Sequence, residues 1–227
     1  MVKKQGLFLL LLFVLLAGVG SAIDTQKNII TGYVTCEESQ LPLKSGVITL
    51  GEYQAPIREG RFHLEGIPPG MYEAVVDGTY RRPVREKVLV GLGIQEKNFV
   101  VPCEFNEEDV QLLARITHAE AEGESLEGKT AVAATVLNRV KNENYPDSIA
   151  GVVYQRVNGI YQYSPVADGR INLQPGQESK RAAYLALAGE DPTKGATGFY
   201  NPRKTGDRWV RQHPVTTAIG GHVFFRY

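Results

Sequence analysis

The apolar pattern of this chain changes near residue 105, from short β-type runs to helical spacing. Between residues 28 and 103, runs of β-branched and aromatic residues alternate with turn signals such as Glu59-Gly60 and Pro68-Pro69-Gly70. From Asn106 onward, apolar residues recur three or four positions apart. A 227-residue chain with both periods is expected to form two small domains.

The first 22 residues have the pattern of a secretory signal peptide. Lys3 and Lys4 form a basic start, Leu7 to Val19 is apolar, and small residues end the segment at Ala22. We expect cleavage after Ala22 and export to the cell wall or spore, with no stable membrane insertion afterwards. A retained anchor is the alternative, because an uncleaved apolar run of about 17 residues lies at the short edge of a membrane span. The predicted domains are therefore 1–22, 23–104 and 105–227.

Residues 23–104 are predicted to form an all-β sandwich. Short strands at roughly ten-residue spacing are typical of such folds, and they are expected at 31–35, 46–50, 61–64, 71–76, 87–90 and 97–101. The run from Gly60 to Tyr72 resembles the transthyretin-like domains related to those of carboxypeptidases. The resemblance implies a spacer, folding partner or adhesion module without chemistry of its own.

The chain has two cysteines, Cys36 and Cys103, which bracket this β domain. In an exported protein such a pair predicts a disulfide. Closing a loop of about 67 residues would stabilise the fold by roughly 4 kcal/mol in the loop-entropy model. Two free thiols are the alternative.

A capped helix opens the second domain and carries one unusual carboxylate. Asn106 is the expected N-cap, and Phe105 and Val110 are placed to form a hydrophobic staple. Glu120 continues the apolar stripe of this helix, whereas Glu122 should face solvent. Burial raises the pKa of a carboxyl group, as a general acid near neutral pH requires. A structural ion pair of Glu120 is the alternative.

The C-terminal half resembles the SleB/CwlJ-type cell-wall hydrolases, the spore cortex-lytic family. The resemblance runs in order through residues 109–227, and His118 departs from the aromatic residue usual there. It rests on the segments Ala119–Glu124, Glu127–Val140, Tyr145-Pro146, Ile149–Gln155, Tyr163–Asn172, Phe199–Pro202 and Ile219–Phe224. It implies an α+β, lysozyme-like, mainly helical catalytic domain with a small β-hairpin region, and it places the catalytic acid at Glu120.

The same resemblance implies an enzyme that cuts peptidoglycan glycan strands between N-acetylmuramic acid and N-acetylglucosamine. A lytic transglycosylase needs only one Glu, whereas ordinary glycoside hydrolysis uses two carboxylates. Glu124, Asp168 and Asp207 are candidates for a second carboxylate, and spacing selects none of them. No cofactor is expected. Spore cortex, during germination, and vegetative wall are both open as substrates, and no regulatory partner is indicated.

A glycan cleft needs aromatic rings, hydroxyls and amides. Tyr163, Ser164, Tyr200 and Asn201 supply these groups in matching segments and are the predicted substrate-binding residues. Core or surface packing is the alternative for the tyrosines, since the chain has 11 of them.

Other classes of function find less support in the sequence. A metal-dependent wall amidase or peptidase could use His118, Glu122, His213 and His222, but no clustered metal motif is present. A non-catalytic wall-binding protein is the third class. The net charge of zero gives no reason to expect a nucleic-acid partner.

Overall fold

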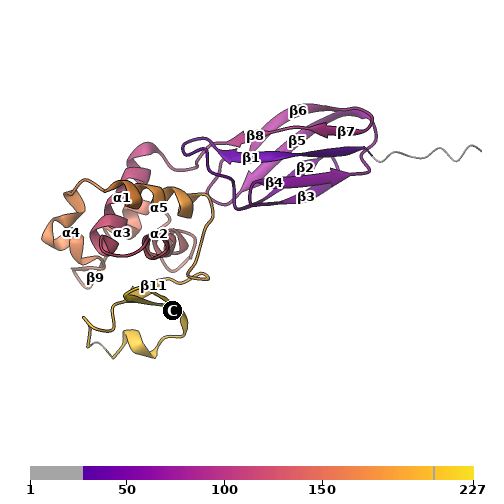
Figure 1. Cartoon of the computed structure of the whole chain (residues 1–227). Helices are drawn as coiled ribbons and strands as arrows, with labels where there is room; N and C mark the ends of the chain where they lie inside the picture. Colours follow the sequence, from indigo (N-terminus) through magenta and orange to yellow (C-terminus); the bar gives the residue numbers. More distant parts are fainter. Residues whose placement is uncertain (1–27, 207) are drawn as a thin grey trace, which may run out of the picture.

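The computed structural model describes residues 28–206 and 208–227, which form a β unit and a mainly helical unit lying end to end (Figure 1). The predicted signal peptide lies outside these residues. Within the described ranges, no helix is both long enough and apolar enough to cross a membrane.

The β unit is one eight-stranded sheet with its own apolar core. Its strands are β1 (Ile29–Cys36), β2 (Ser45–Leu50), β3 (Tyr53–Arg58), β4 (Arg61–Glu65), β5 (Gly70–Gly78), β6 (Val84–Val90), β7 (Ile94–Glu96) and β8 (Phe99–Val101). They pair in the order β6-β5-β2-β3-β4-β1-β7, and β8 also pairs with β1. All pairings are antiparallel except those of β1 with β7 and β8.

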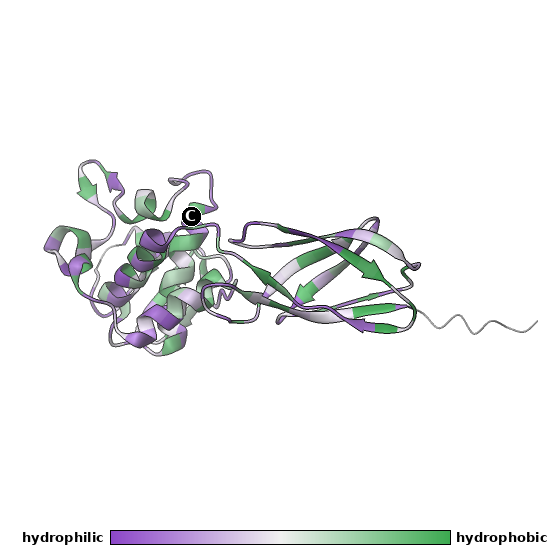
Figure 2. Ribbon diagram, turned by 90° about the horizontal axis from the view of Figure 1, so that it is seen from above, coloured by the Kyte–Doolittle hydropathy of each residue, from purple (hydrophilic) through white to green (hydrophobic). Residues whose placement is uncertain are grey.

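This sheet differs from the predicted pair of separate sheets. Hydrogen bonds follow one continuous path, and the path curls so that Val88 of β6 and Phe99 of β8 share a core with Ile30 of β1. Apolar and polar residues alternate along most strands, as Figure 2 shows, because successive side chains point to opposite faces. The sequence pattern missed β3, whose Pro56 weakens a strand signal, and the three-residue β7.

Cys36 and Cys103 are buried free thiols in the structure, so the expected disulfide is not formed there. Cys36 ends β1, and Cys103 follows the neighbouring parallel strand β8. Burial raises the pKa of Cys36 to about 11 and also raises that of Cys103. Both thiols are therefore poor nucleophiles at neutral pH.

The helical unit begins where the sequence predicted. Its helices are α1 (Glu107–Ala121), α2 (Leu126–Val140), α3 (Ile149–Val153), α4 (Ser164–Asp168) and α5 (Gln177–Leu187). Asn106 caps α1 by accepting a hydrogen bond from the Asp109 amide at 2.9 Å. Ser125 caps α2 in the same way through Gly128. Caps of this kind satisfy amides that the first helical turn leaves unpaired.

Short elements complete this unit. They are the hairpin β9 (Arg156–Val157) and β10 (Ile160–Tyr161), the 3-10 turns η1 (Arg170–Asn172) and η2 (Val210–Gln212), and a sheet of β11 (Gly198–Tyr200), β12 (Val215–Ile219) and β13 (His222–Phe225). The three-stranded sheet has the order β11-β13-β12 and lies beside α2 (Figure 1). The family resemblance implied a small β-hairpin region in this unit. Periodicity did not reveal β12 or α4, which are five residues each and too short for a clear period.

The two units share a packed interface. Tyr80 of the β unit belongs to the core of the helical unit, and Ala188, just after α5, belongs to the core of the β unit. Arg81 pairs with Glu38 at 2.7 Å and donates a hydrogen bond to the Leu187 carbonyl, also at 2.7 Å. The Arg81 side chain is fully buried. The interface therefore contains a charge that depends on both units for its partners.

Candidate active site

Glu120 lies one residue before the end of α1, half-buried on the side that continues the apolar stripe of the helix. Glu122, two residues on, is exposed, as the sequence predicted. Burial raises the pKa of Glu120 from 4.5 to about 7, which outweighs the lowering effect of Arg170. Near neutral pH this carboxyl group is therefore close to half protonated.

Arg170 is the cation with the largest effect on Glu120, and the neighbouring turn fixes its position. Its Nη1 donates to the carbonyl of Ala119 at 2.7 Å, directly before Glu120. Its Nε and Nη2 donate to one carboxylate oxygen of Asp168 at 3.0 and 2.9 Å, and Nη2 also reaches the Ser164 hydroxyl at 3.5 Å. Asp168 in turn raises the pKa of Glu120, whereas Arg170 lowers the pKa of Asp168. An acid with a raised pKa thus stands beside an ionised carboxylate.

Tyr163 is near Glu120, but its side chain does not lie on an open surface. It is 2% exposed and belongs to the helical core. The Arg139 guanidinium lies 5.1 Å from its ring centre, and its hydroxyl is buried without a hydrogen-bond partner. The ring therefore has no exposed face on which a sugar could stack, which corrects the prediction for this residue. Ser164, the next residue, is exposed.

Glu124 joins the end of α1 to the turn between β12 and β13. Its Oε2 accepts a hydrogen bond from the Gly221 amide at 3.0 Å, and its Oε1 lies 3.7 Å from Nδ1 of His222. A Cβ atom at Gly220 would lie 2.0 Å from Oε2, and one at Gly221 would lie 2.8 Å from Oε1. The two glycines therefore make room for this carboxylate. Burial lowers the pKa of His222 despite the nearby Glu124.

The predicted residues Tyr200 and Asn201 lie at the end of β11 and are both half-buried. The Asn201 side chain accepts a hydrogen bond from the Arg203 amide at 2.9 Å, which closes a turn that carries Lys204. Lys204 lowers the pKa of Glu120, so this turn lies on the Glu120 side of the domain. Ser164 thus contacts Arg170, and Asn201 closes the turn that carries Lys204, so each lies beside a cation that lowers the pKa of Glu120.

The residues proposed for a metal site are distributed over three places. His118 lies 3.8 Å from Glu122 on α1, and His222 lies beside Glu124. His213 stacks on Phe225, with 5.3 Å between ring centres. In the described ranges no three His, Cys, Asp or Glu side chains are grouped so that they could share a metal ion. Asp207, a candidate second carboxylate, lies outside the described residues.

Sequence reasoning did not assign a role to Arg170 or Lys204. The positive charges of both residues lower the pKa of Glu120, and both residues lie far from Glu120 in the chain. Arg170 stands inside the Tyr163–Asn172 segment that carried the family resemblance, so a signal was present. Arg139, which also affects Glu120, donates from its Nε to the Thr197 carbonyl at 2.6 Å.

Comparison with known proteins concerns the helical half. The family described as Cell Wall Hydrolase matches residues 123–225. The spore cortex-lytic enzyme of Halalkalibacterium halodurans is 37% identical over 129 residues, which cover 57% of this chain and 38% of that protein. The spore cortex-lytic enzyme of Bacillus cereus is 35% identical over 130 residues, which cover 57% and 49%. The chain therefore spans less than half the length of these relatives.

One solved structure is matched by this chain over nearly its whole length. The catalytic domain of the germination-specific lytic transglycosylase SleB from Bacillus anthracis is 34% identical, with a TM-score of 0.50. The match covers 54% of this chain and 97% of that domain. Through its C-terminal half, the chain belongs to the cell-wall hydrolase family.

Proposed function

We propose that the protein is a lytic transglycosylase that cuts peptidoglycan between N-acetylmuramic acid and N-acetylglucosamine, with Glu120 as its one catalytic acid and base. The observation that carries this proposal is the pKa of about 7 that burial gives Glu120. One group can give up a proton and later take one back with least cost when its pKa lies near the working pH. The similarity to spore cortex-lytic enzymes and to the SleB catalytic domain supports the substrate class.

The proposed reaction takes place in two steps. The protonated Glu120 first donates its proton to the oxygen that joins the two sugars, and the bond from that oxygen to C1 of the muramic acid breaks. The Glu120 carboxylate then removes the proton from the C6 hydroxyl of the same muramic acid, whose oxygen bonds to C1. The product end is a 1,6-anhydro ring, Glu120 is protonated again, and no water is consumed.

The carboxylates near Glu120 are already engaged. Asp168 accepts hydrogen bonds from Arg170, and Glu124 accepts one from Gly221. Neither is free to act as a nucleophile without losing these contacts, which favours the single-Glu route. The ionised Asp168 is the group that would act in a hydrolytic muramidase, since it is close enough to raise the pKa of Glu120.

We further propose a lysozyme-like arrangement for residues 105–227, a transthyretin-like identity for residues 23–104, and export after cleavage of residues 1–22. In this arrangement Ser164, Tyr200 and Asn201 line the glycan-binding surface. Exposure of Ser164 and half-burial of the other two support contact with a sugar strand. Peptidoglycan of the spore cortex is the substrate that the similarity favours.

Mass spectrometry of digested peptidoglycan tests the proposal. We expect anhydro-muramic ends, produced equally with and without EDTA. Hydrated reducing ends would indicate a muramidase, and cut peptides that disappear with EDTA would indicate a metal-dependent amidase or peptidase. The rate should also fall as the pH rises through about 7, because ionised Glu120 has no proton to donate.

A further inference from the structure

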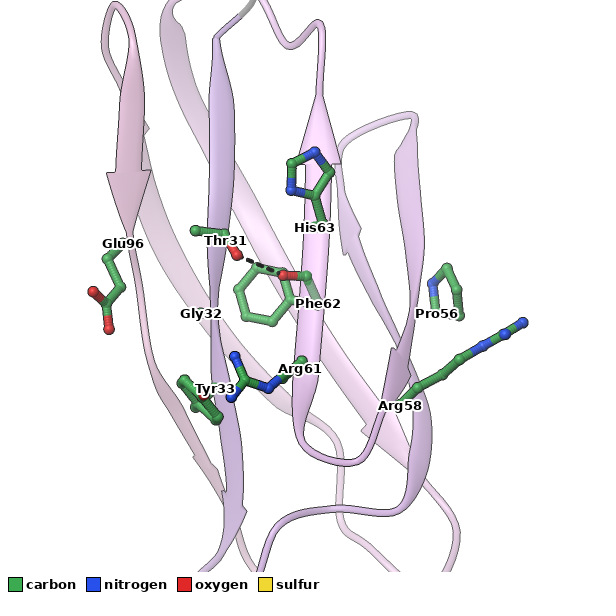
Figure 3. Close-up of a pocket in the computed structure, with 9 residues that line it drawn as sticks. All are labelled: Thr31, Gly32, Tyr33, Pro56, Arg58, Arg61, Phe62, His63 and Glu96. Atoms are coloured by element: carbon green, nitrogen blue, oxygen red, sulfur yellow. Dashed lines mark hydrogen bonds between the residues drawn. The ribbon is translucent and has the colours of Figure 1, made fainter.

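A hollow on the outer face of the β unit has an unusual set of side chains (Figure 3). It encloses about 570 Å³ over strands β1, β3, β4 and β7. Its charged and aromatic lining residues are the exposed Tyr33, Arg58, Arg61, His63 and Glu96, and the buried Phe62. The volume lies within the usual range for a ligand site, about 300–1,000 Å³.

The sheet register places the two arginines side by side. Arg58 of β3 is the cross-strand partner of Arg61 of β4, and Arg61 is the partner of Tyr33 of β1. One row of side chains thus runs across three strands on the outer face. Like charges directly opposite each other destabilise a sheet. Among the described residues, no carboxylate forms an ion pair with Arg58 or Arg61. The repulsion between the two positive charges is therefore not compensated by an acidic side chain of the described chain.

Arg61 packs over the ring of Tyr33. Its guanidinium carbon lies 4.5 Å from the centre of the Tyr33 ring, and Figure 3 shows it turned toward that ring while Arg58 extends outward from β3. An aromatic ring that stacks on a guanidinium group orients the plane of that group. The N–H donors at the edge of the guanidinium stay free to bind an anion. His63 lies two residues further along β4, opposite Thr31. Glu96 is the one acidic lining residue, at the β7 side.

From this arrangement we infer that the β unit binds the carboxylate groups of peptidoglycan in the hollow formed by Tyr33, Arg58, Arg61 and His63. The identity of the ligand rests on the proposed function, because peptidoglycan carries carboxylates on its peptide stems. Each guanidinium group can match a planar carboxylate by two parallel hydrogen bonds. The β unit thereby retains the enzyme on the wall while Glu120, in the other unit, acts on the glycan.

Co-sedimentation with intact, purified sacculi tests the site. Every protein carries Glu120→Gln, so that sacculi stay whole during the measurement. The double variant Arg58→Gln, Arg61→Gln should bind at least tenfold more weakly. The control Arg85→Gln, Lys87→Gln removes two exposed charges from β6 and should bind as the parent does. Equal binding by both double variants would overturn the inference.

Two further arms identify the ligand. Sacculi whose carboxylates have been converted to amides should bind the parent protein as weakly as untreated sacculi bind the Arg58→Gln, Arg61→Gln variant. Removal of phosphate-bearing wall polymers should change nothing, and a loss of binding there would mean that phosphate is the ligand. Arg58→Lys, Arg61→Lys keeps the charge but not the bidentate geometry, so it should bind less well than the parent but better than the Gln variant.

The outcome is separate from that of the proposed function. Binding is measured with Glu120 replaced, and the products are measured with Glu120 present. If the unaltered protein releases no glycan ends yet the arginine variants lose retention, the proposed function fails and the site stands. If glycan ends appear and retention is unaffected by the arginine changes, the site fails and the proposed function stands.

Discussion

The helical unit and the β unit treat charged side chains in opposite ways. Around Glu120 the charged groups contact one another or the backbone, and burial changes the pKa of Glu120. On the outer face of the β unit, Arg58 and Arg61 are exposed and stand next to each other without a carboxylate partner among the described residues. The first arrangement is suited to proton transfer, and the second to binding an anion supplied from outside.

The largest effect is expected at Glu120. Glu120→Gln keeps the size of the side chain and removes its proton, so peptidoglycan release should fall by at least 10²–10⁴-fold while the circular dichroism spectrum is unchanged. Glu122→Gln is the matched control, because Glu122 is exposed two residues away. Release at the unaltered rate by Glu120→Gln would rule out Glu120 as the acid.

Arg81 tests how far the two units depend on each other. Arg81→Met leaves Glu38 and the Leu187 carbonyl without their buried partner. Breaking such a pair is expected to lower the free energy of unfolding in urea by about 3–5 kcal/mol. In the control Arg85→Met, the lost pair with Glu73 is well exposed, and a cost of about 0–1 kcal/mol is expected. Equal costs for the two variants would mean that the interface contributes little.

Gly220 tests the contact between α1 and the β12–β13 turn. Gly220 has a φ of +56°, and a Cβ atom there would collide with the Glu124 carboxylate. Gly220→Ala should therefore lower the free energy of unfolding by about 1–3 kcal/mol through strain and loss of the Glu124 contact. Gly206→Ala, where a Cβ atom meets nothing within 4 Å, should leave stability close to its original value.

The pH dependence of stability gives a smaller, signed effect. Because the folded-state pKa of Glu120 is raised from 4.5 to about 7, the proton on this group stabilises the fold fully below pH 4.5. That contribution is lost as the pH rises through about 7. Glu120→Gln has no such proton, so its melting temperature relative to the unaltered protein should increase between pH 4.5 and pH 8. A difference that stays constant over this range would contradict the raised pKa.

The smallest effect concerns the thiols of the β unit. The structure predicts two free thiols in denatured, unreduced protein and slow reaction of both in the folded protein, since burial raises their pKa values. Thiol titration before and after denaturation measures this. A count of zero after denaturation would show that Cys36 and Cys103 are joined after export.

Local sequence determined much of the fold. The N-cap at Asn106, the apolar stripe through Ile116 and the exposed position of Glu122 were all predicted and confirmed. Each depends on residues within one or two helical turns, where spacing fixes which side a residue faces. For the same reason the candidate acid Glu120 could be chosen, because its half-buried position follows from the period of α1.

The surroundings of Glu120 were decided only by the tertiary structure. The contact of Arg170 with Ala119 joins residues 51 apart, and that of Gly221 with Glu124 joins residues 97 apart. The burial of Tyr163 and the row Arg58–Arg61–Tyr33 likewise depend on which segments lie together. Periodicity shows which face of a helix or strand is buried. It does not show which other element packs against that face. Sequence alone therefore selected the candidate acid, whereas long-range packing set its pKa and assembled the cationic hollow.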